Sequence, residues 1–304
     1  MIQRVVPELV RRKALHLGAA GERWLAGLPA LVADVARQWS ITIGESLHGG
    51  SASFVARART FDGRGVVLKL VLPGHEVVGQ VEALRAADGL GYVRLHAADV
   101  PRGALLLEAL GKPIDLPPEP TMVVLARMLR QAWQVPRGGG PVPDKAGALG
   151  AMVDRLWHSH GRPCSARVHA VALEFARRRA LFDPALSVVV HGDPHPGNVL
   201  RVLSPRPGAE TGYVFVDPDG FPGDPAYDLG VVLREWSAPL LAADDAPALA
   251  RRYCALLAAE SGLDETAIWE WGFLERVSTG LYLLDFGATS LGGRYLRTAE
   301  LLAS

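Results

Sequence analysis

The chain has 304 residues with 49% hydrophobic content, enough to bury a substantial core in two lobes. Lys+Arg and Asp+Glu are 32 each, so the formal charge is zero and no global field draws the chain to nucleic acid or an anionic membrane. The two cysteines, Cys164 and Cys254, are too few and too far apart for a disulfide framework and suit a reducing compartment.

The sequence shows no secretory signal, no candidate membrane span and no nucleic-acid-binding motif. Residues 1–13 lack the apolar segment of a secretory signal, and no apolar run approaches the ~18 residues of a membrane span. We find no zinc-finger spacing and no interleaved basic and aromatic stripe. The sequence therefore predicts a cytoplasmic protein without nucleic-acid or membrane partners, and we expect a monomer.

The first third of the chain predicts a β-rich segment. Residues 40–47, 54–60 and 66–72 have the composition of strands, and residues 62–65 form a hairpin turn between the last two. Helical composition follows at residues 75–87.

A loop of small residues connects the first two of these strands. It contains Gly49, Gly50, Ser51 and Ser53, whose backbone amides could approach phosphates closely. Paired glycines also mark ordinary turns, so both interpretations of this loop remain open.

Lys69 is the only charge in the apolar run 66–72. A buried ammonium requires an anionic neighbour, such as nucleotide phosphates or a carboxylate. The following helix offers Glu76 and Glu82, and we expect Glu82 because it lies at mid-helix on the predicted inner face. The alternative is an edge-strand lysine that reaches solvent.

The strand-like run 105–110 ends at a Gly-Lys-Pro break, where we place the boundary between two lobes. The lobes span residues 1–110, including an N-terminal helical extension, and 111–304. The second lobe is predicted to be mainly helical, with helices at 121–133, 147–160, 166–180, 226–236, 245–261 and 265–286.

Residues 188–200 contain the most informative pattern, a polar loop between two apolar strands. In this loop, Asp193 and Asn198 stand in an Asp-x-x-x-x-Asn spacing, the offset of a kinase catalytic loop. An aspartate in the first position can accept a hydroxyl proton, and an asparagine five residues later can bind a metal through its carbonyl oxygen. The alternative is a turn whose polar side chains bond to local amides.

Asp217 favours the catalytic interpretation. It ends the apolar run 213–216, where an ionised carboxylate is costly without a partner. A divalent cation bridging nucleotide phosphates would supply that partner. Asp219 is either a further ligand or a turn former.

His191 and His195 permit a different hypothesis, because His-x-Asp-x-His also suits a transition metal. No third imidazole or thiolate is nearby, and the second carboxylate-bearing strand fits a hard, oxygen-preferring ion better. We expect His191 to anchor the loop by bonding to backbone.

The motif His191-Gly192-Asp193-Pro-His195-Pro-Gly-Asn198 resembles the catalytic loop of the aminoglycoside phosphotransferase family. This resemblance implies an α+β, protein-kinase-like bilobal fold with a small β-rich N-terminal lobe and a larger, mainly helical C-terminal lobe. It also implies that Asp193 is the catalytic base, supported by His191, and that Asn198 and Asp217 bind Mg²⁺.

The same resemblance implies a nucleoside triphosphate, ATP or GTP, bound between the lobes. Its adenine edge would meet the hinge strand around Glu108 and Leu110, and its phosphates would meet Lys69 and the loop of small residues. That loop departs from the fuller glycine pattern of protein kinases.

Three segments resemble, more narrowly, the streptomycin 6-phosphotransferase-like branch, also described as aminoglycoside/hydroxyurea resistance kinases. They are residues 24–32, the catalytic loop and residues 216–229, where Asp228 is expected to brace the catalytic loop. The activity implied is ATP-dependent phosphorylation of an aminoglycoside, streptomycin at its 6-hydroxyl.

Streptomycin carries guanidinium groups and a methylamine, so its pocket should offer carboxylates and aromatic faces. Asp193 would face the acceptor, and six further residues of suitable types are Trp236, Glu270, Trp271, Glu275, Tyr282 and Asp285. A half-exposed helix face is the alternative interpretation of this set. Asp285-Phe286-Gly287 spells the magnesium triplet of protein kinases but comes too late in the chain for that role.

Other functions remain open. Hydroxyurea is a possible acceptor in the same branch, and a choline, homoserine or methylthioribose kinase would share the catalytic loop and differ in its pocket. A pseudokinase is disfavoured because the base, the lysine and both metal ligands are in place.

Overall fold

The computed structural model describes residues 6–47, 52–74 and 77–303. They form two compact units, which are described separately. Unit 1 comprises residues 1–112 and 200–216, and unit 2 comprises residues 113–199 and 217–304. The chain therefore passes from one unit to the other three times, and the passages after residues 199 and 216 border the catalytic-loop motif and Asp217.

Unit 1 contains a five-stranded antiparallel sheet in the order β1-β2-β3-β5-β4. Its strands are β1 (Ile41–Ser46), β2 (Ser53–Thr60), β3 (Gly65–Val71), β4 (Leu95–Asp99) and β5 (Ala104–Glu108). The three strands expected at the start of the chain are confirmed within one to two residues at most boundaries, and the hairpin turn joins β2 to β3.

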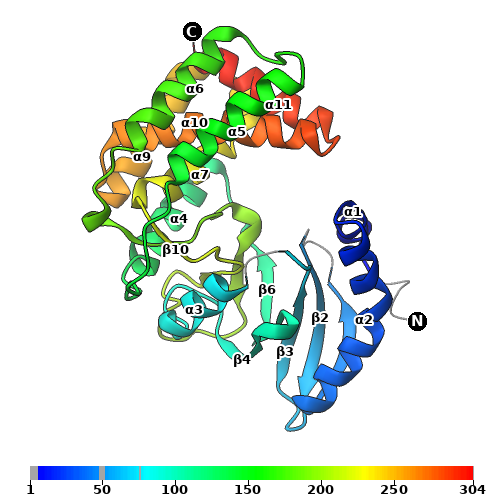
Figure 1. Cartoon of the computed structure of the whole chain (residues 1–304). Coiled ribbons are helices and arrows are strands. Elements are labelled where there is room, and N and C mark those ends of the chain that lie inside the picture. The colour runs from blue at the N-terminus through cyan, green and yellow to red at the C-terminus, as the bar shows by residue number, and fades with distance from the viewer. Residues whose placement is uncertain (1–5, 48–51, 75–76, 304) are drawn as a thin grey trace. The chain divides into compact units, whose positions relative to one another are not determined.

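Two N-terminal helices, α1 (Glu8–His16) and α2 (Ala19–Gln38), lie along this sheet (Figure 1). Their apolar faces share one core with the sheet, in which Val10, Leu28 and Val35 pack with Leu68 and Leu70. Burial of aliphatic side chains from both layers stabilises this packing.

Helix α3 (Val78–Ala87) and a short 3-10 turn, η2 (Val100–Arg102), complete the first segment of unit 1. A second, three-stranded sheet has the order β6-β8-β9, formed by β6 (Leu110–Pro113), β8 (Val199–Val202) and β9 (Tyr213–Phe215). In unit 1, Arg206 donates to both oxygens of Glu108 at 2.9 and 2.7 Å. This ion pair ties the returning segment 200–216 to the end of β5.

Unit 2 is mainly helical. Its helices are α4 (Pro118–Ala132), α5 (Lys145–Ser159), α6 (Ala166–Arg179), α7 (Pro225–Arg234), α8 (Ser237–Ala242), α9 (Ala246–Ser261), α10 (Glu265–Asp285) and α11 (Thr289–Leu302). The six helices expected in this lobe are confirmed, whereas α8 and α11 were not predicted. In the residue ranges that the structure covers, no helix combines the length and apolarity needed to cross a bilayer.

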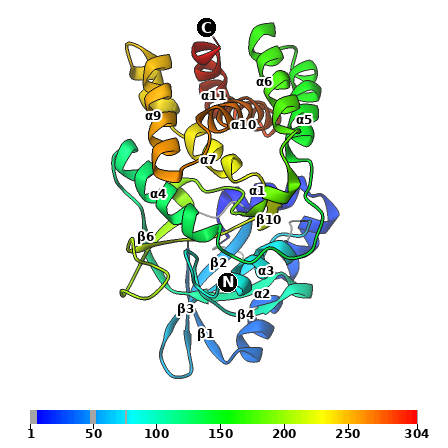
Figure 2. The same ribbon diagram turned by 90° about the vertical axis from the view of Figure 1, so that its left-hand side faces the viewer.

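Helix α10 is the centre of unit 2, with α5, α6, α7, α9 and α11 packed around it (Figure 2). It is buried on almost every side from Ala267 to Leu281, and then becomes exposed at its C-terminal end. The α7–α10 crossing is close: a Cβ added to Gly230 would lie 2.4 Å from the Cβ of Trp271. This close approach brings the C-terminal end of α7 against the middle of α10.

The catalytic-loop motif follows a short buried strand of unit 2. Strand β7 (Val188–Val190) pairs antiparallel with β10 (Phe221–Gly223), with Val190 opposite Phe221. The loop then runs through a 3-10 turn, η4 (Pro196–Asn198). A second such turn, η3 (Pro184–Leu186), precedes β7.

Candidate active site

Asp228, a fully buried residue of α7, holds the catalytic loop of unit 2 by hydrogen bonds to its backbone. Its Oδ2 accepts the backbone N–H of His191 at 2.9 Å and its Oδ1 accepts that of Gly192 at 2.9 Å. Trp133 Nε1 also donates to Oδ2 at 2.9 Å. Asp228 thus braces the start of the loop.

Burial raises the pKa of Asp228 to about 7, although the donors from Trp133, Gly192 and His191 act in the opposite direction. A buried carboxylate that receives three N–H donors is fully engaged by the protein. Asp228 therefore holds the loop and offers no free oxygen to a substrate.

Local bonds within the loop fix its remaining backbone. His191 Nδ1 accepts the N–H of Asp193 at 3.1 Å, and Asn198 Nδ2 donates to the carbonyl of Asp193 at 3.0 Å. His195 Nδ1 accepts the N–H of Gly197 at 3.0 Å, so in the neutral ring the proton is on Nε2. The bond that His191 accepts from the backbone agrees with its expected role as an anchor.

The segment that contains Asp217 and Asp219 lies directly beside this loop. Asp219 N donates to the carbonyl of His191 at 2.7 Å. Gly192 has a φ of +93°, and a Cβ there would come within 2.6 Å of the Asp219 side chain, so only glycine fits. Asp217 has a φ of +58°, a left-handed conformation that is uncommon for a residue with a side chain and occurs at functional sites.

The loop and the adjacent segment 217–219 carry oxygen-bearing side chains of the types that suit a hard divalent cation. Asp193, Asp217 and Asp219 supply carboxylates, and the bond from Asn198 Nδ2 leaves its Oδ1 as an acceptor. Oxygen donors of this kind are the ligands that Mg²⁺ prefers. Among the described residues no cluster of three His, Cys, Asp or Glu side chains forms a metal site by itself. A Mg²⁺ bound through one or two protein groups and nucleotide phosphates would fit this donor set.

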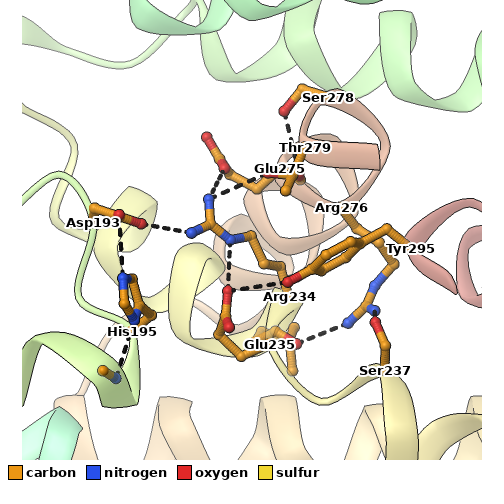
Figure 3. Close-up of polar contacts among 12 residues, drawn as sticks. Asp193, His195, Arg234, Glu235, Ser237, Glu275, Arg276, Ser278, Thr279 and Tyr295 are labelled. Atoms are coloured by element: carbon orange, nitrogen blue, oxygen red, sulfur yellow. Dashed lines mark hydrogen bonds and ion pairs between the residues drawn. The ribbon is translucent and has the colours of Figure 1, made fainter. Parts of the chain in front are cut away.

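Asp193 is the accessible acid of the loop, since 40% of its side chain is exposed. Arg234 Nη2 donates to its Oδ1 at 2.5 Å, and His195 Nε2 lies 3.5 Å from its Oδ2 (Figure 3). Burial of the group raises the pKa of Asp193, but the charges of Arg234 and His195 outweigh that effect, and the pKa lies below its usual value. Asp193 is therefore ionised at neutral pH.

The ion pair between Arg234 and Glu275 was not predicted from the sequence. Glu275 was expected to contact substrate, and it is 3% exposed and bonded to Arg234 at 2.6 Å. Arg234 was not predicted at all, because in the sequence it is one arginine at the end of a helix among many. Helical spacing gave no signal either, because six residues separate it from Asp228 and residues at that spacing leave an α-helix in different directions.

The other residues expected at the acceptor occupy different environments. Tyr282 is 40% exposed and packs against Phe286 with ring centroids 4.8 Å apart. Asp285 ends α10, is half-exposed and lies 3.1 Å from His160 Nε2. Trp236 is half-buried, and its indole N–H makes no hydrogen bond within the part of the chain that the structure describes.

Glu270 and Trp271 are interior residues, 1% and 2% exposed. Glu270 pairs with Arg178 at 3.1 Å and with Arg179 at 2.7 Å, which joins α10 to α6. Trp271 donates to Asp224 at 2.8 Å and borders a cavity of about 200 Å³ that no catalytic-loop residue lines. Both side chains are thus engaged in contacts within the helical unit.

The nucleotide-binding residues were expected in unit 1. Lys69 is 6% exposed on β3, and its Nζ donates to Gln80 Oε1 of α3 at 2.9 Å. Glu82 is exposed on α3, so the structure corrects the expected pairing of Lys69 with Glu82: the α3 group that receives the Lys69 bond is an amide two residues earlier. Glu76, the other candidate, lies outside the described residues.

Gly49, Gly50 and Ser51 also lie outside the described residues, and Ser53 begins β2 as a buried residue. Glu108 uses its carboxylate to bind Arg206 and the N–H of Arg94, and its own N–H donates to the carbonyl of Arg94 at 2.9 Å. Neither its carboxylate nor its N–H is therefore left for a nucleotide base. Leu110 begins β6 and is 7% exposed.

Solved structures with this architecture include choline kinase LicA from Streptococcus pneumoniae, with a TM-score of 0.62 and 14% identity over 90% of this chain and 98% of that chain. A second structure of LicA is in complex with AMP. The sheet of unit 1 and the helices of unit 2 therefore have the protein-kinase-like fold, as expected.

The sequence relatives narrow the class further. The chain is 30% identical to streptomycin 6-kinase of Streptomyces glaucescens, over 98% of this chain and 96% of that relative. It is 30% identical to hydroxyurea phosphotransferase of Kitasatospora aureofaciens, over 97% and 84%. The family model described as aminoglycoside/hydroxyurea antibiotic resistance kinase matches residues 38–287. The chain belongs to this family of kinases.

Proposed function

We propose that this kinase uses ATP to phosphorylate and inactivate an aminoglycoside, with streptomycin at its 6-hydroxyl as the acceptor. The main support is the exposed carboxylate of Asp193, held in a braced loop within a cluster of net negative charge. Asp193, Glu235 and Glu275 share the single guanidinium of Arg234, so the surroundings of the base favour a cationic acceptor.

An acidic and aromatic face of α10 extends from this cluster. Glu275, Thr279, Tyr282 and Phe286 follow one another at spacings of four, three and four residues, which places them on one side of the helix. Exposure increases along this face from the buried Glu275 to the half-exposed Tyr282 and Phe286. Aromatic rings with the carboxylate of Asp285 nearby are suitable partners for guanidinium and methylamine groups. The interior Glu270 and Trp271 are not part of this proposed surface.

Asp193 orients the acceptor hydroxyl and takes up its proton. Because the pKa of this carboxylate lies below its usual value, it is a weak base, and we infer that the proton moves late in the transfer. Asn198 and Asp217 would hold Mg²⁺, and Lys69 would bind nucleotide phosphates. A bound Mg²⁺ supplies neutralisation of the charge on the phosphate oxygens.

The streptomycin 6-kinase relative supports streptomycin, and the hydroxyurea phosphotransferase relative, at equal identity, supports hydroxyurea as the second candidate. The test is an ADP-release assay with streptomycin, other aminoglycosides, hydroxyurea, choline and homoserine, and mass spectrometry of each product. We expect phosphorylated streptomycin. Phosphorylation of hydroxyurea or choline alone would overturn the proposed acceptor and retain the reaction class.

The hydroxyl that receives the phosphoryl group is identified from the same product. Fragmentation should place the phosphoryl group on the streptidine ring at the 6-hydroxyl. Phosphate on any other hydroxyl would contradict the proposed regiochemistry. The variant Tyr282→Ala should raise the KM for streptomycin and leave the KM for ATP unchanged, because the aromatic face is proposed to contact the acceptor alone.

A further inference from the structure

Arg234, at the C-terminal end of α7, makes four side-chain bonds (Figure 3). Its Nη2 donates to Asp193 Oδ1 at 2.5 Å, and its Nη1 donates to Glu275 Oε2 at 2.6 Å and to Thr279 Oγ1 at 3.3 Å. Its Nε donates to Glu235 Oε1 at 3.0 Å. These bonds use four of the five N–H groups of the guanidinium, so Arg234 has little capacity left for a substrate phosphate.

Exposure separates the members of this network. The side chains of Arg234 and Glu275 are 12% and 4% exposed, whereas that of Asp193 is 40% exposed. The guanidinium therefore lies beneath the catalytic carboxylate, and Glu275 lies deeper still. A bond from a buried, fully engaged donor fixes an exposed acceptor more firmly than a bond between two surface side chains does.

Charge balance does not require the bond to Asp193. Glu235 and Glu275 already supply two carboxylates to Arg234. Other ionisable groups close to Asp193 are the imidazoles of His191 and His195, from the loop itself. Asp193 is thus the third carboxylate that contacts one guanidinium, and we look to the geometry of this contact for its role.

We propose that Arg234, held in place by Glu275, is a positioning residue that fixes Oδ1 of Asp193 so that Oδ2 is presented to the acceptor hydroxyl. This inference rests on the proposed function of Asp193 as the base. The α7–α10 crossing sets the position of Arg234. The position of the Asp193 carboxylate therefore depends on how these two helices pack. Misplacement of a catalytic group by about 1 Å can cost about a hundredfold in rate.

The test uses substitutions that separate positioning from charge burial. Arg234→Met alone would leave Glu275 buried without a cation, which destabilises the fold. The double variant Arg234→Met/Glu275→Gln removes both charges, and Glu275→Gln alone keeps the bond from Arg234 to Asp193. Arg234→Lys retains the charge without the planar fork.

Arg276 provides a matched control. It is a buried arginine of the same helical unit, 1% exposed, and it bonds to Ser237, Thr298 and the carbonyl of Leu233. Arg276→Met should lower the melting temperature and leave kcat unchanged at a temperature where it is fully folded. It reports the effect of losing a buried arginine that does not touch Asp193.

We expect the double variant to lose about a hundredfold in kcat with an unchanged KM for ATP. Glu275→Gln should lose less, and Arg234→Lys should recover part of the rate. A double variant with the kcat of the wild-type chain, or an Arg276→Met chain with the same loss, would overturn the inference. These assays use whichever acceptor the wild-type chain phosphorylates.

A second measurement does not depend on the acceptor. In crystal structures of the wild-type chain and the double variant, the carboxylate of Asp193 should leave its wild-type rotamer when Arg234 is replaced. An unchanged Asp193 side chain would overturn the inference even if no acceptor were known. Lack of wild-type turnover with every acceptor would contradict the proposed function, and the crystal comparison would still decide the positioning role.

Discussion

Asp193 and Asp228 show how two aspartates of one unit acquire different properties. Asp193 is 40% exposed and paired with a guanidinium, which lowers its pKa. Asp228 is fully buried and receives only neutral N–H donors, and burial raises its pKa to about 7. Environment alone therefore shifts the pKa values of the two carboxylates in opposite directions, which fits the proposed role of Asp193 as base and the bracing contacts of Asp228.

The raised pKa of Asp228 predicts a pH dependence of stability. A folded-state pKa of about 7 against the ordinary value of 3.8 means that the folded chain binds the proton more tightly. This contribution is present below pH 3.8 and is lost as the pH rises to about 7. The free energy of unfolding, measured by urea titration from pH 5 to 8, should fall less steeply for Asp228→Asn than for the wild-type chain.

Asp228→Asn also has a consequence at fixed pH. Its Nδ2 group would face a backbone N–H that donates to a carboxylate oxygen in the wild-type chain, at a cost of about 1–3 kcal/mol. Identical pH slopes in the two chains would contradict the assigned pKa. Unchanged stability at pH 7 would contradict the bracing role.

Lys69 permits a prediction about the nucleotide. Lys69→Ala removes a buried ammonium that we propose to bind phosphates. A hydrogen bond to a charged group contributes about 1.5–3 kcal/mol, so the KM for ATP should rise about tenfold or more. Unchanged steady-state constants for ATP would show that Lys69 has no contact with the nucleotide.

Much of the loop chemistry could be read from residue spacing. The Asp-x-x-x-x-Asn pattern placed Asp193 and Asn198 in one loop, where Asn198 bonds to the carbonyl of Asp193. The contact of Asp219 with His191 was not predicted. The partner of Lys69 could not be read in this way, because Glu82 and Gln80 differ by two positions and thus lie on opposite sides of α3. Arg234 escaped prediction because its role arises from a contact 41 residues away in the chain.

At the scale of elements, the α7–α10 crossing is the contact on which the site depends. Gly230 permits it, and Gly230→Ala would place a methyl group 2.4 Å from the Cβ of Trp271. We expect a loss of about 1–3 kcal/mol in the free energy of unfolding, because backbone must shift to relieve the overlap. Turnover should fall as well, since Arg234 follows in the next turn of α7.

A matched glycine lies in α11 of the same unit. A Cβ at Gly293 would meet only the end of Arg297, at 3.5 Å. Gly293→Ala should therefore stabilise the helix by about 0.5–1 kcal/mol and leave turnover unchanged. Equal effects of the two substitutions in thermal unfolding would contradict the close-crossing account.

Helical composition located six of the helices of unit 2, where apolar residues recur at helical spacing between clear breaks. Helix α8 was hidden because its six residues are too short to show a period. Helix α11 was hidden by two consecutive glycines near its start, which lower helix propensity. Tertiary packing against α10 compensates for that low propensity.

At the scale of the whole molecule, each of the two units is built from two stretches of chain that are separated in the sequence. A single boundary near residue 110 was expected, whereas residues 200–216 return to unit 1 and are tied to it by the pair of Arg206 and Glu108. The return of residues 200–216 to unit 1 could not be predicted, because Arg206 and Glu108 are far apart in the sequence and neither segment has a distinctive pattern of its own. The catalytic loop and Asp217 flank this excursion, so both lie where the chain changes units.

The central claim is that Asp193 directs phosphoryl transfer from ATP to an acceptor hydroxyl. The most direct measurement is a single-turnover reaction with γ-labelled ATP and streptomycin, read by mass spectrometry, for the wild-type chain and Asp193→Asn, with Mg²⁺-ATP binding measured for both by calorimetry. We predict one phosphoryl group on the wild-type product, a loss of about 10²–10⁴-fold in rate for Asp193→Asn, and nearly equal nucleotide binding. Near-normal transfer by Asp193→Asn would contradict the account.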